Sequence, residues 1–158
     1  MIPTLTLADR GYLITGPGDD SKSFGIGVEL YVPGGAEVSC TYNVTRRFGL
    51  QALIGFKEWT AGDMYGVKAL YRLASFSSEN LDHDIGNLYG YGLIGLYTQT
   101  EPYEQSTTVS LGLGTEVTPF FLPQETLRFV GEVGLIKATD PKYFSVVPTF
   151  NFGIRYYF

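Results

Sequence analysis

Hydrophobic and polar residues alternate along most of the chain between Phe24 and Phe158. An alternation with a period of two places successive side chains on opposite faces of a β-strand. Glycine, proline and other turn-forming residues separate the alternating runs, and helical periodicity is hard to find. The pattern predicts eight β-strands, at residues 23–32, 36–45, 48–59, 64–74, 88–98, 107–118, 126–138 and 145–158.

The predicted strands are joined by short connections such as PGG, TAGD and TDPKYF, and the one longer connection is SFSSENLDHDIGN. Strands that follow one another through short turns favour an up-and-down antiparallel arrangement. Residues 1–22 fit no strand pattern. The sequence therefore divides into an N-terminal segment of undetermined structure, residues 1–22, and a β domain, residues 23–158.

Most of the predicted strands have one face that is apolar throughout. In the last strand this face carries Phe152, Ile154, Tyr156 and Phe158, and no charged residue interrupts the apolar row of this or the other strands. The fifth strand, LYGYGLIGLYT, is apolar on both sides, so the pattern does not assign its faces. Alternation alone does not determine whether the apolar faces point into a barrel or out of it.

The opposite face of the strands carries glycine and a small, balanced set of charged residues. Acidic residues stand against basic residues in nearly equal number: Glu29, Glu37, Glu116 and Glu132 against Lys57, Lys68, Arg72, Arg128 and Arg155. A buried charge without a partner is strongly unfavourable, so a buried network requires matched charges. A solvated face has no such requirement. The balance predicts that this charged face lines the interior and that the apolar face points outward.

An outward apolar face predicts a membrane-spanning barrel. Each predicted strand has about the 9–11 residues that a tilted strand needs to cross a bilayer. Backbone groups in lipid must all be paired, which favours a closed barrel, and eight strands leave an interior just filled by side chains. We therefore predict an all-β fold, an eight-stranded antiparallel up-and-down transmembrane β-barrel with short loops. Aromatic residues near strand ends would form its interface belts, namely Tyr31, Tyr42, Trp59, Tyr65, Tyr97, Tyr143 and Tyr156. The alternative is that some of them belong to an ordinary hydrophobic core.

Composition narrows the function classes. Charged residues make up 17% of the chain, against about 25% in a typical soluble domain. The net charge of -5 argues against nucleic acid as a partner, because phosphate binding needs clustered basic residues. The single cysteine, Cys40, excludes an internal disulfide. No apolar run is long enough for a transmembrane helix, and the start, MIPTLTLADRGY, lacks the pattern of a signal peptide. If the protein is exported, we expect this to be a mature form with an added Met1.

Several segments resemble those of small bacterial outer-membrane β-barrels. The hairpin YNVTRRFGLQALIGF resembles their periplasmic turns, LYGYGLIGLY their fifth strand, and VSLGLGTEV with LRFVGEVGL their sixth and seventh strands. The chain is similar to the superfamily of OmpA-like and OmpX-like eight-stranded barrels over residues 23–158. By this resemblance the final GIRYYF implies the C-terminal signal that the outer-membrane assembly machinery recognises, with Gly153, Tyr156 and Phe158 at the matching positions.

Two motifs with catalytic or cofactor associations are weak. Residues 90–95, GYGLIG, match the dinucleotide-binding glycine pattern, but no helical pattern follows them, so glycines that relieve crowding in a barrel strand explain them better. His83 lies between Asp82 and Asp84 and follows Ser77 and Ser78. Adjacent residues point apart and no second histidine exists to complete a zinc site. The sequence predicts no catalytic residue, no metal and no cofactor.

The prediction for function is a small barrel integral to the bacterial outer membrane, with a structural or envelope role and a lumen plugged by the charged network. Its expected partners are outer-membrane lipids, the assembly machinery and, as a further candidate, a second copy of itself. Three alternatives stay open: a lipid-modifying enzyme of the outer membrane, a narrow ion pore, and a soluble lipocalin-like barrel that binds an apolar ligand.

Overall fold

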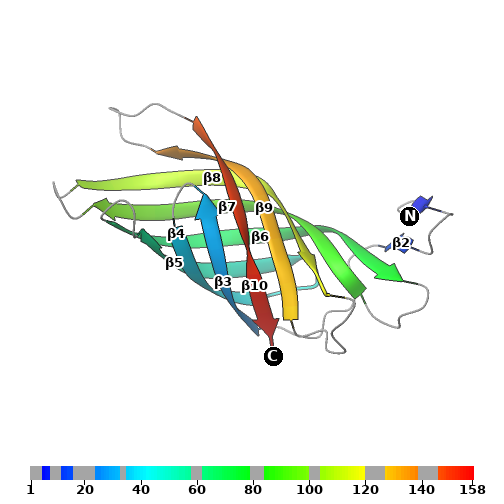
Figure 1. Ribbon diagram of the computed structural model, residues 1–158. Coiled ribbons are helices and arrows are strands. Elements are labelled where there is room, and N and C mark those ends of the chain that lie inside the picture. The colour runs from blue at the N-terminus through cyan, green and yellow to red at the C-terminus, as the bar shows by residue number, and fades with distance from the viewer. Residues whose placement is uncertain are drawn as a thin grey trace.

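The computed structural model describes residues 5–7, 12–15, 24–32, 35–57, 62–78, 84–99, 104–119, 127–138 and 146–158. Two short strands precede a series of longer ones (Figure 1). The strands are β1 Leu5–Leu7, β2 Tyr12–Thr15, β3 Phe24–Val32, β4 Gly35–Asn43, β5 Phe48–Lys57, β6 Gly62–Ser78, β7 Asp84–Gln99, β8 Glu104–Val117, β9 Leu127–Ala138 and β10 Val146–Tyr157. No helix in the described part of the chain has the length and apolar character needed to cross a membrane.

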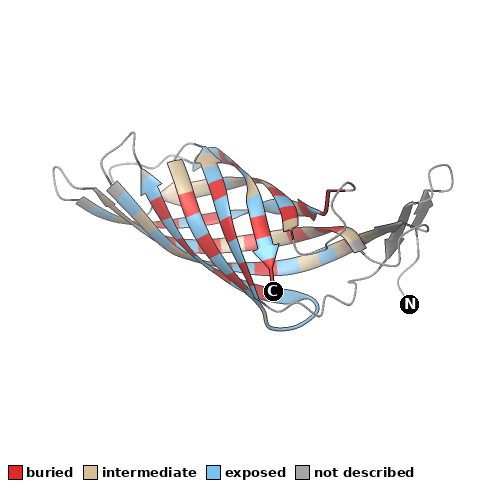
Figure 2. Ribbon diagram, turned by 60° about the horizontal axis from the view of Figure 1, so that its bottom comes forward, coloured by how far each residue is buried: buried red, intermediate tan, exposed pale blue. Residues whose placement is uncertain are grey.

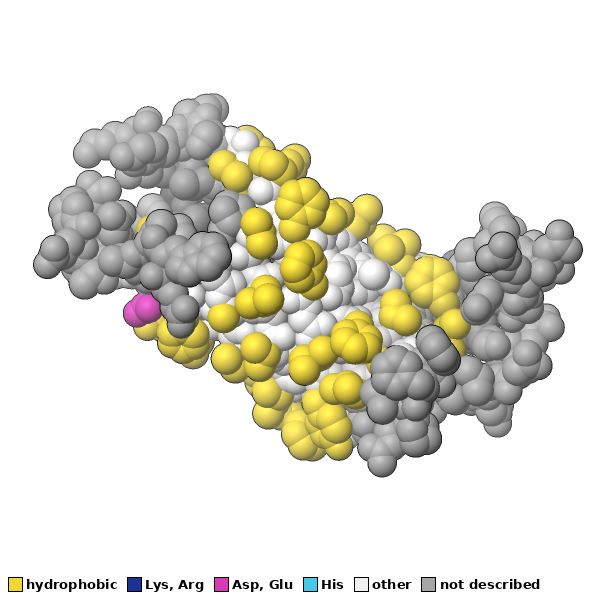
Figure 3. Space-filling view, in the orientation of Figure 1, with side chains coloured by type: hydrophobic (Ala, Val, Ile, Leu, Met, Phe, Trp, Pro, Cys, Tyr) yellow, Lys and Arg dark blue, Asp and Glu magenta, His cyan; other side chains and the backbone are white. Residues whose placement is uncertain are grey.

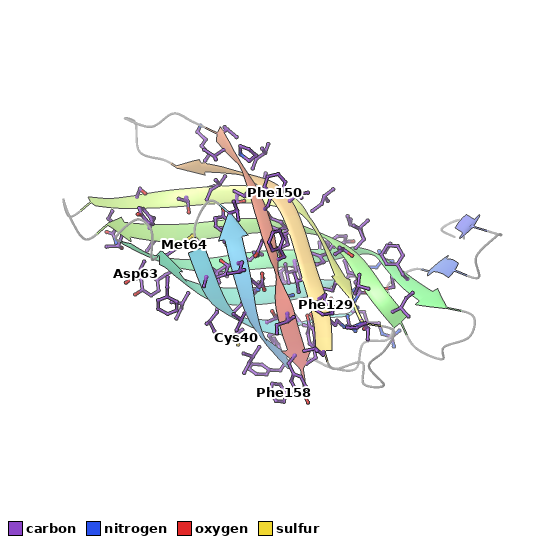
Figure 4. All side chains as sticks on the ribbon, in the orientation of Figure 1. Cys40, Asp63, Met64, Phe129, Phe150 and Phe158 are labelled. Atoms are coloured by element: carbon purple, nitrogen blue, oxygen red, sulfur yellow. The ribbon has the colours of Figure 1, made fainter. Side chains whose placement is uncertain are left out.

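Strands β3 to β10 form a closed antiparallel barrel. Each pairs with the next strand in the sequence, and β10 returns to pair with β3, as in Phe152 opposite Leu30 and Ile154 opposite Val28. The eight-stranded up-and-down fold predicted from the sequence is confirmed. We call the end of the barrel at which β3 begins and β10 ends the terminal end, and the opposite end the far end. In Figure 4, Phe158 lies at the terminal end and Asp63 at the far end.

Strands β6 and β7 are longer than the alternation predicted. The register of the β6–β7 ladder shifts between Arg72 and Ala74, which marks a β-bulge. Up to the bulge the inward positions of β6 are even-numbered, as at Lys68 and Leu70, whereas beyond it the buried residue is Ser75. A bulge changes the parity of the pattern, which is why the sequence prediction ended at residue 74.

The N-terminal segment, for which no strand was predicted, contains the β1–β2 hairpin. Strand β2 pairs with the end of β6, with Tyr12 opposite Ser78 and Thr15 opposite Ser75. Strand β5 leaves that edge of β6 at the pair Phe48–Tyr71, so β2 covers the edge where β5 no longer does. Strands of three and four residues are too short to show a period, which explains why the sequence pattern missed them.

The barrel reverses the burial of a water-soluble domain. Inward positions that are mostly buried alternate with exposed positions along the barrel strands (Figure 2), and the exposed positions carry the large apolar side chains. Ile26, Leu111 and Phe152 are 45%, 66% and 56% exposed, whereas Glu29 and Arg155 are fully buried. Hydrophobic side chains cover the visible wall of the barrel in Figure 3. The predicted orientation, apolar outside and charged inside, is the one observed.

The structure also assigns the faces of the fifth barrel strand, β7. Tyr89, Tyr91 and Leu93 are buried in the lumen, and Ile94 and Leu96 are exposed on the outer wall. Both faces are apolar in composition because tyrosine takes the place of charged residues on the inner one. Its hydroxyl can satisfy a polar lumen while its ring packs against the wall.

Candidate functional site in the barrel lumen

Glu29 is the centre of a buried polar network. Its Oε1 accepts hydrogen bonds from Ser39 Oγ at 3.1 Å, Gln51 Nε2 at 3.0 Å and Arg155 Nη2 at 2.7 Å. Its Oε2 accepts one from Asn151 Nδ2 at 2.5 Å. These donors come from β4, β5 and β10, so the carboxylate of Glu29 on β3 connects four strands of the barrel by hydrogen bonds. Bonds in which donor or acceptor is charged are the stronger kind.

Arg155 joins Glu29 to a second cluster nearer the terminal end. Its Nη1 forms an ion pair with Glu116 Oε1. The same glutamate is approached by Arg128 Nη1 at 3.4 Å and accepts a hydrogen bond from Tyr157 Oη at 2.9 Å. Arg155 is therefore shared between two carboxylates, and Glu116 between two arginines. This arrangement balances the charges of side chains that are at most 5% exposed.

A third cluster is formed by Lys68, Glu132 and two tyrosines of β7. Lys68 Nζ forms an ion pair with Glu132 Oε2 at 2.7 Å, and Tyr89 Oη donates to Glu132 Oε1 at 2.8 Å. The ammonium group of Lys68 also lies 4.9 Å from the centre of the Tyr91 ring, within the range of a cation–π interaction. Strands β6 and β9 are not neighbours in the barrel, so the Lys68–Glu132 pair crosses the lumen.

The side-chain amide of Asn151 connects these clusters. Its Nδ2 lies 2.5 Å from Glu29 Oε2, 2.9 Å from Glu37 Oε1 and 3.2 Å from Glu132 Oε2. The second carboxylate oxygen of Glu37 has no hydrogen-bond partner within the described part of the chain. Glu37 thus has the fewest hydrogen bonds of the buried glutamates, and the Asn151 amide donates to its other carboxylate oxygen.

Most of the predicted lumen residues lie inside the barrel. Seven of them are buried inside the barrel: Glu29, Glu37, Lys68, Glu116, Arg128, Glu132 and Arg155. Arg72 is half-buried and lines a small cavity of about 20 Å³ at the terminal end. The side chain of Lys57, at the far end of β5, lies outside the described residues. The described inward set therefore has four glutamates and four basic residues, with Lys68, Arg72, Arg128 and Arg155 as the bases.

Sequence reasoning missed several members of the network. Gln51 and Asn151 stand on the same faces as the charged residues, so the alternation could have identified them as lumen residues. Tyr89 and Tyr91 carried no such signal because their strand showed no polar face. What the sequence cannot give is which side chains meet across the lumen, because that depends on the width and stagger of the barrel.

Glycines make room for the tyrosine rings. A Cβ atom added to Gly114 would lie 2.4 Å from Cζ of Tyr89, and one added to Gly134 would lie 2.3 Å from the hydroxyl of Tyr91. A side chain at these positions would displace the ring. The glycines on the inner face of β8 and β9 therefore set where the tyrosine hydroxyls lie.

The predicted aromatic belts are corrected in part. Tyr42, Tyr65 and Tyr156 are exposed on the outer wall. Tyr31 and Tyr97 instead lie on the inward-facing rows of β3 and β7 and are half-buried, because their positions have the parity of the lumen residues. Trp59 and Tyr143 lie outside the described residues.

The C-terminal residue is held in the sheet. The amide of Phe158 donates to the Phe24 carbonyl at 2.9 Å, and its ring centre lies 5.9 Å from that of Phe24 and 5.0 Å from that of Tyr156. A Cβ on Gly153 would come within 2.6 Å of the Glu29 backbone. These contacts locate the three residues of the proposed assembly signal, whose recognition stays a prediction.

The GYGLIG segment lies inside the continuous strand β7. Crowding explains Gly95, where an added Cβ would lie 3.0 Å from Thr108 Oγ1, but the expectation is wrong for Gly90 and Gly92, where an added Cβ would meet no atom nearer than 3.4 Å. His83 and Asp82 lie outside the described residues, as do the side chains of Ser77, Ser78 and Asp84. Cys40 is a free thiol exposed on the outer wall. Among the described side chains, no group of three or more His, Cys, Asp and Glu residues is arranged to hold a metal ion.

Comparison with known proteins identifies the fold. No family model and no curated protein sequence matches the chain. The N-terminal β-barrel domain of Pseudomonas aeruginosa OprF is similar in structure, with a TM-score of 0.64 and 11% sequence identity, over 94% of this chain and 98% of that domain. Ail, the attachment invasion locus protein of Yersinia pestis, aligns over 94% of this chain and 99% of its own with a TM-score of 0.39 and 16% identity. The similarity to the OprF domain confirms, at the level of the fold, the β-barrel predicted from the sequence.

Proposed function

We propose that the protein is an integral β-barrel of the bacterial outer membrane, with a structural role in the envelope and a lumen closed by its charged network. The observation that carries the proposal is the reversed burial, with apolar side chains on the outer wall and charged side chains inside. Similarity in fold to the OprF barrel domain adds support.

The outer wall is too apolar for water. Exposed large hydrophobic side chains occur on every barrel strand from β3 to β10. Leaving one such side chain half exposed costs on the order of 1 kcal/mol, so the wall as a whole would cost on the order of 20 kcal/mol or more. The stability of a typical domain is only about 5–15 kcal/mol. Contact with acyl chains removes this cost, which argues against the soluble lipocalin-like alternative.

The lumen supports a closed barrel. Contacts run without a break from Tyr157 through Glu116, Arg155 and Glu29 to Asn151, and from there to Glu132 and Lys68. This chain of side chains crosses the interior. A barrel whose interior is filled in this way strengthens the wall rather than conducting solutes.

The test is heat modifiability together with membrane insertion. Purified protein refolded into phospholipid vesicles should migrate differently on an SDS gel before and after boiling, and it should stay with the vesicles after an alkaline wash. A protein that remains monomeric and dispersed without detergent would contradict the membrane assignment. Discrete conductance steps in planar bilayers would instead favour the pore, and a lipid A profile changed by the chain but not by its His83→Ala variant would favour an enzyme.

A further inference from the structure

An apolar hollow of about 460 Å³ lies in the outer wall across β6, β7 and β8. Its floor consists of Ala69, Gly90 and Gly92, with Ala69 paired opposite Gly92 in the β6–β7 ladder. Phe48, Tyr71 and Leu111 border it. The neighbouring wall carries large side chains, so the small residues leave a depression in an otherwise bulky apolar surface.

The two glycines in this hollow are not required by packing. A Cβ added to Gly90 would meet no atom nearer than 3.9 Å, and one added to Gly92 would meet only Leu111 Cδ2 at 3.4 Å. Lumen glycines differ, since a Cβ at Gly112 or Gly114 would overlap a tyrosine ring. The hollow therefore does not follow from the demands of the barrel interior.

A basic turn adjoins the terminal end of the hollow. Arg46 and Arg47 are exposed in the four-residue turn between β4 and β5, directly before Phe48. The Arg72 amide donates to the Arg47 carbonyl at 2.8 Å, which fixes the turn beside the end of the hollow at Tyr71. The turn itself is ordered by Thr45, whose Oγ1 accepts hydrogen bonds from the amides of Arg47 and Phe48.

We propose that the hollow and the dibasic turn together bind one phospholipid with an anionic head group, taken from the surrounding membrane leaflet. An acyl chain would lie over Gly90 and Gly92, and the phosphate would lie beside Arg46 and Arg47 at the rim. The inference rests on the proposed membrane location. Charge complementarity selects the occupant, because a second barrel with the same basic turn would bring like charges together.

The outer wall contains its own control site. A second apolar hollow, of about 350 Å³, lies over Gly131 and is bordered by Leu113, Val133 and Phe152. A Cβ on Gly131 would meet only Thr115 Cγ2, at 3.9 Å. The connection that follows β8, residues 118–126, has no lysine or arginine. The two hollows are alike in size and lining but differ in the adjacent positive charge.

The experiment measures lipid retained by the folded protein. Wild type and variants are refolded into vesicles of equal parts phosphatidylcholine and phosphatidylglycerol, extracted with mild detergent and examined by native mass spectrometry. The wild type should retain phosphatidylglycerol over phosphatidylcholine by about fivefold for each arginine, the ratio that corresponds to about 1 kcal/mol per basic residue near an anionic surface. Arg47→Gln should lower this preference about fivefold, and Lys137→Gln, at the far end, should leave it unchanged.

The hollow is tested by filling it. Gly92→Leu should abolish retention of the bound lipid, and Gly131→Leu should not. Equal retention of the two lipids by the wild type, or equal loss in both leucine variants, would overturn the lipid site. The heat-dependent gel shift is recorded for each protein. A wild type that inserts and shifts but shows no preference refutes the lipid site alone, whereas a wild type that does not insert refutes the membrane assignment. If Gly92→Leu does not fold, the lipid preference of Arg47→Gln on the exposed turn still tests the site, and a preference equal to that of the wild type would refute it.

Discussion

Replacing Gly114 by alanine should destabilise the barrel through Tyr89. The added methyl carbon would lie 2.4 Å from Cζ of Tyr89, so the ring has to move by about an ångström or more. Overpacking of this kind costs typically about 1–3 kcal/mol. Moving the ring also stretches the 2.8 Å hydrogen bond from Tyr89 Oη to Glu132, and a hydrogen bond to a charged group contributes about 1.5–3 kcal/mol. Together the two effects should lower the free energy of unfolding by about 2.5–6 kcal/mol.

The matched control is Gly131→Ala. This glycine is in the next strand, β9, on the outer face, where an added Cβ meets no atom nearer than 3.9 Å. Alanine there should leave stability unchanged or raise it by up to about 1 kcal/mol, because it restricts the unfolded chain. Equilibrium urea unfolding in lipid vesicles, followed by tryptophan fluorescence and by the gel shift, measures both variants.

A double variant identifies the ring as the cause. In a Tyr89→Ala background the methyl group of Gly114→Ala has no ring to displace. The second substitution should therefore cost less than it does in the wild type, by about 0.5–3 kcal/mol, the interaction energy typical of residues in contact. If Gly114→Ala costs the same with and without the Tyr89 ring, or the same as Gly131→Ala, the proposed packing of glycine against tyrosine is wrong.

Three further predictions concern the network and the N-terminal hairpin. Arg155→Met leaves Glu29 and Glu116 without their shared cation. It should lower the urea midpoint by the equivalent of about 3–5 kcal/mol. An unchanged midpoint would show that these ion pairs do not stabilise the barrel. Glu37→Gln should leave the urea midpoint unchanged or raise it, because one carboxylate oxygen of Glu37 lacks a partner. Glu29→Gln should lower the midpoint clearly. A larger loss for Glu37→Gln than for Glu29→Gln would contradict the inference that Glu37 is the less well compensated carboxylate. Deletion of residues 1–15 should leave the heat-dependent gel shift intact, because β10 closes on β3 without the hairpin, and loss of the shift would mean that the barrel needs β2 to form.

The sequence predicted the barrel because each strand face has a single environment. Ile26, Val28 and Leu30 are exposed on one side of β3, and Gly27 and Glu29 are buried in the lumen on the other, so the period of two is uninterrupted. The period-two alternation gave a wrong or incomplete prediction where a strand face does not have a single kind of residue throughout. The β6 bulge shifts the parity of the alternation, and the tyrosines of β7 satisfy a polar interior with residues that count as apolar.

The members of the charged network could be predicted, but its connections could not. Lys68 and Glu132 are 64 residues apart in sequence and stand on strands that do not pair. Their contact depends on how the sheet closes and how far its strands are staggered. The role of Asn151 could not be predicted either, because an amide carries no charge that the count of acidic and basic residues would include. Its contacts with three carboxylates depend on the closed barrel.

The shared ion pairs bear on the choice between a structural barrel and a pore. For ions to pass, Arg155 would have to release Glu29 and Glu116, which are both buried. Breaking a buried pair without a replacement partner is strongly unfavourable, typically by about 3–5 kcal/mol, and here two carboxylates lose the same cation at once. Arg128 could hold Glu116, but among the described side chains Glu29 would keep hydrogen bonds only to the neutral donors Ser39, Gln51 and Asn151. An open state would therefore be rare in the wild type, and Arg155→Met should raise conductance in planar bilayers if the network is what closes the lumen. If Arg155→Met folds but conducts no better than the wild type, the lumen is closed by the packing of side chains and not by the ion pairs.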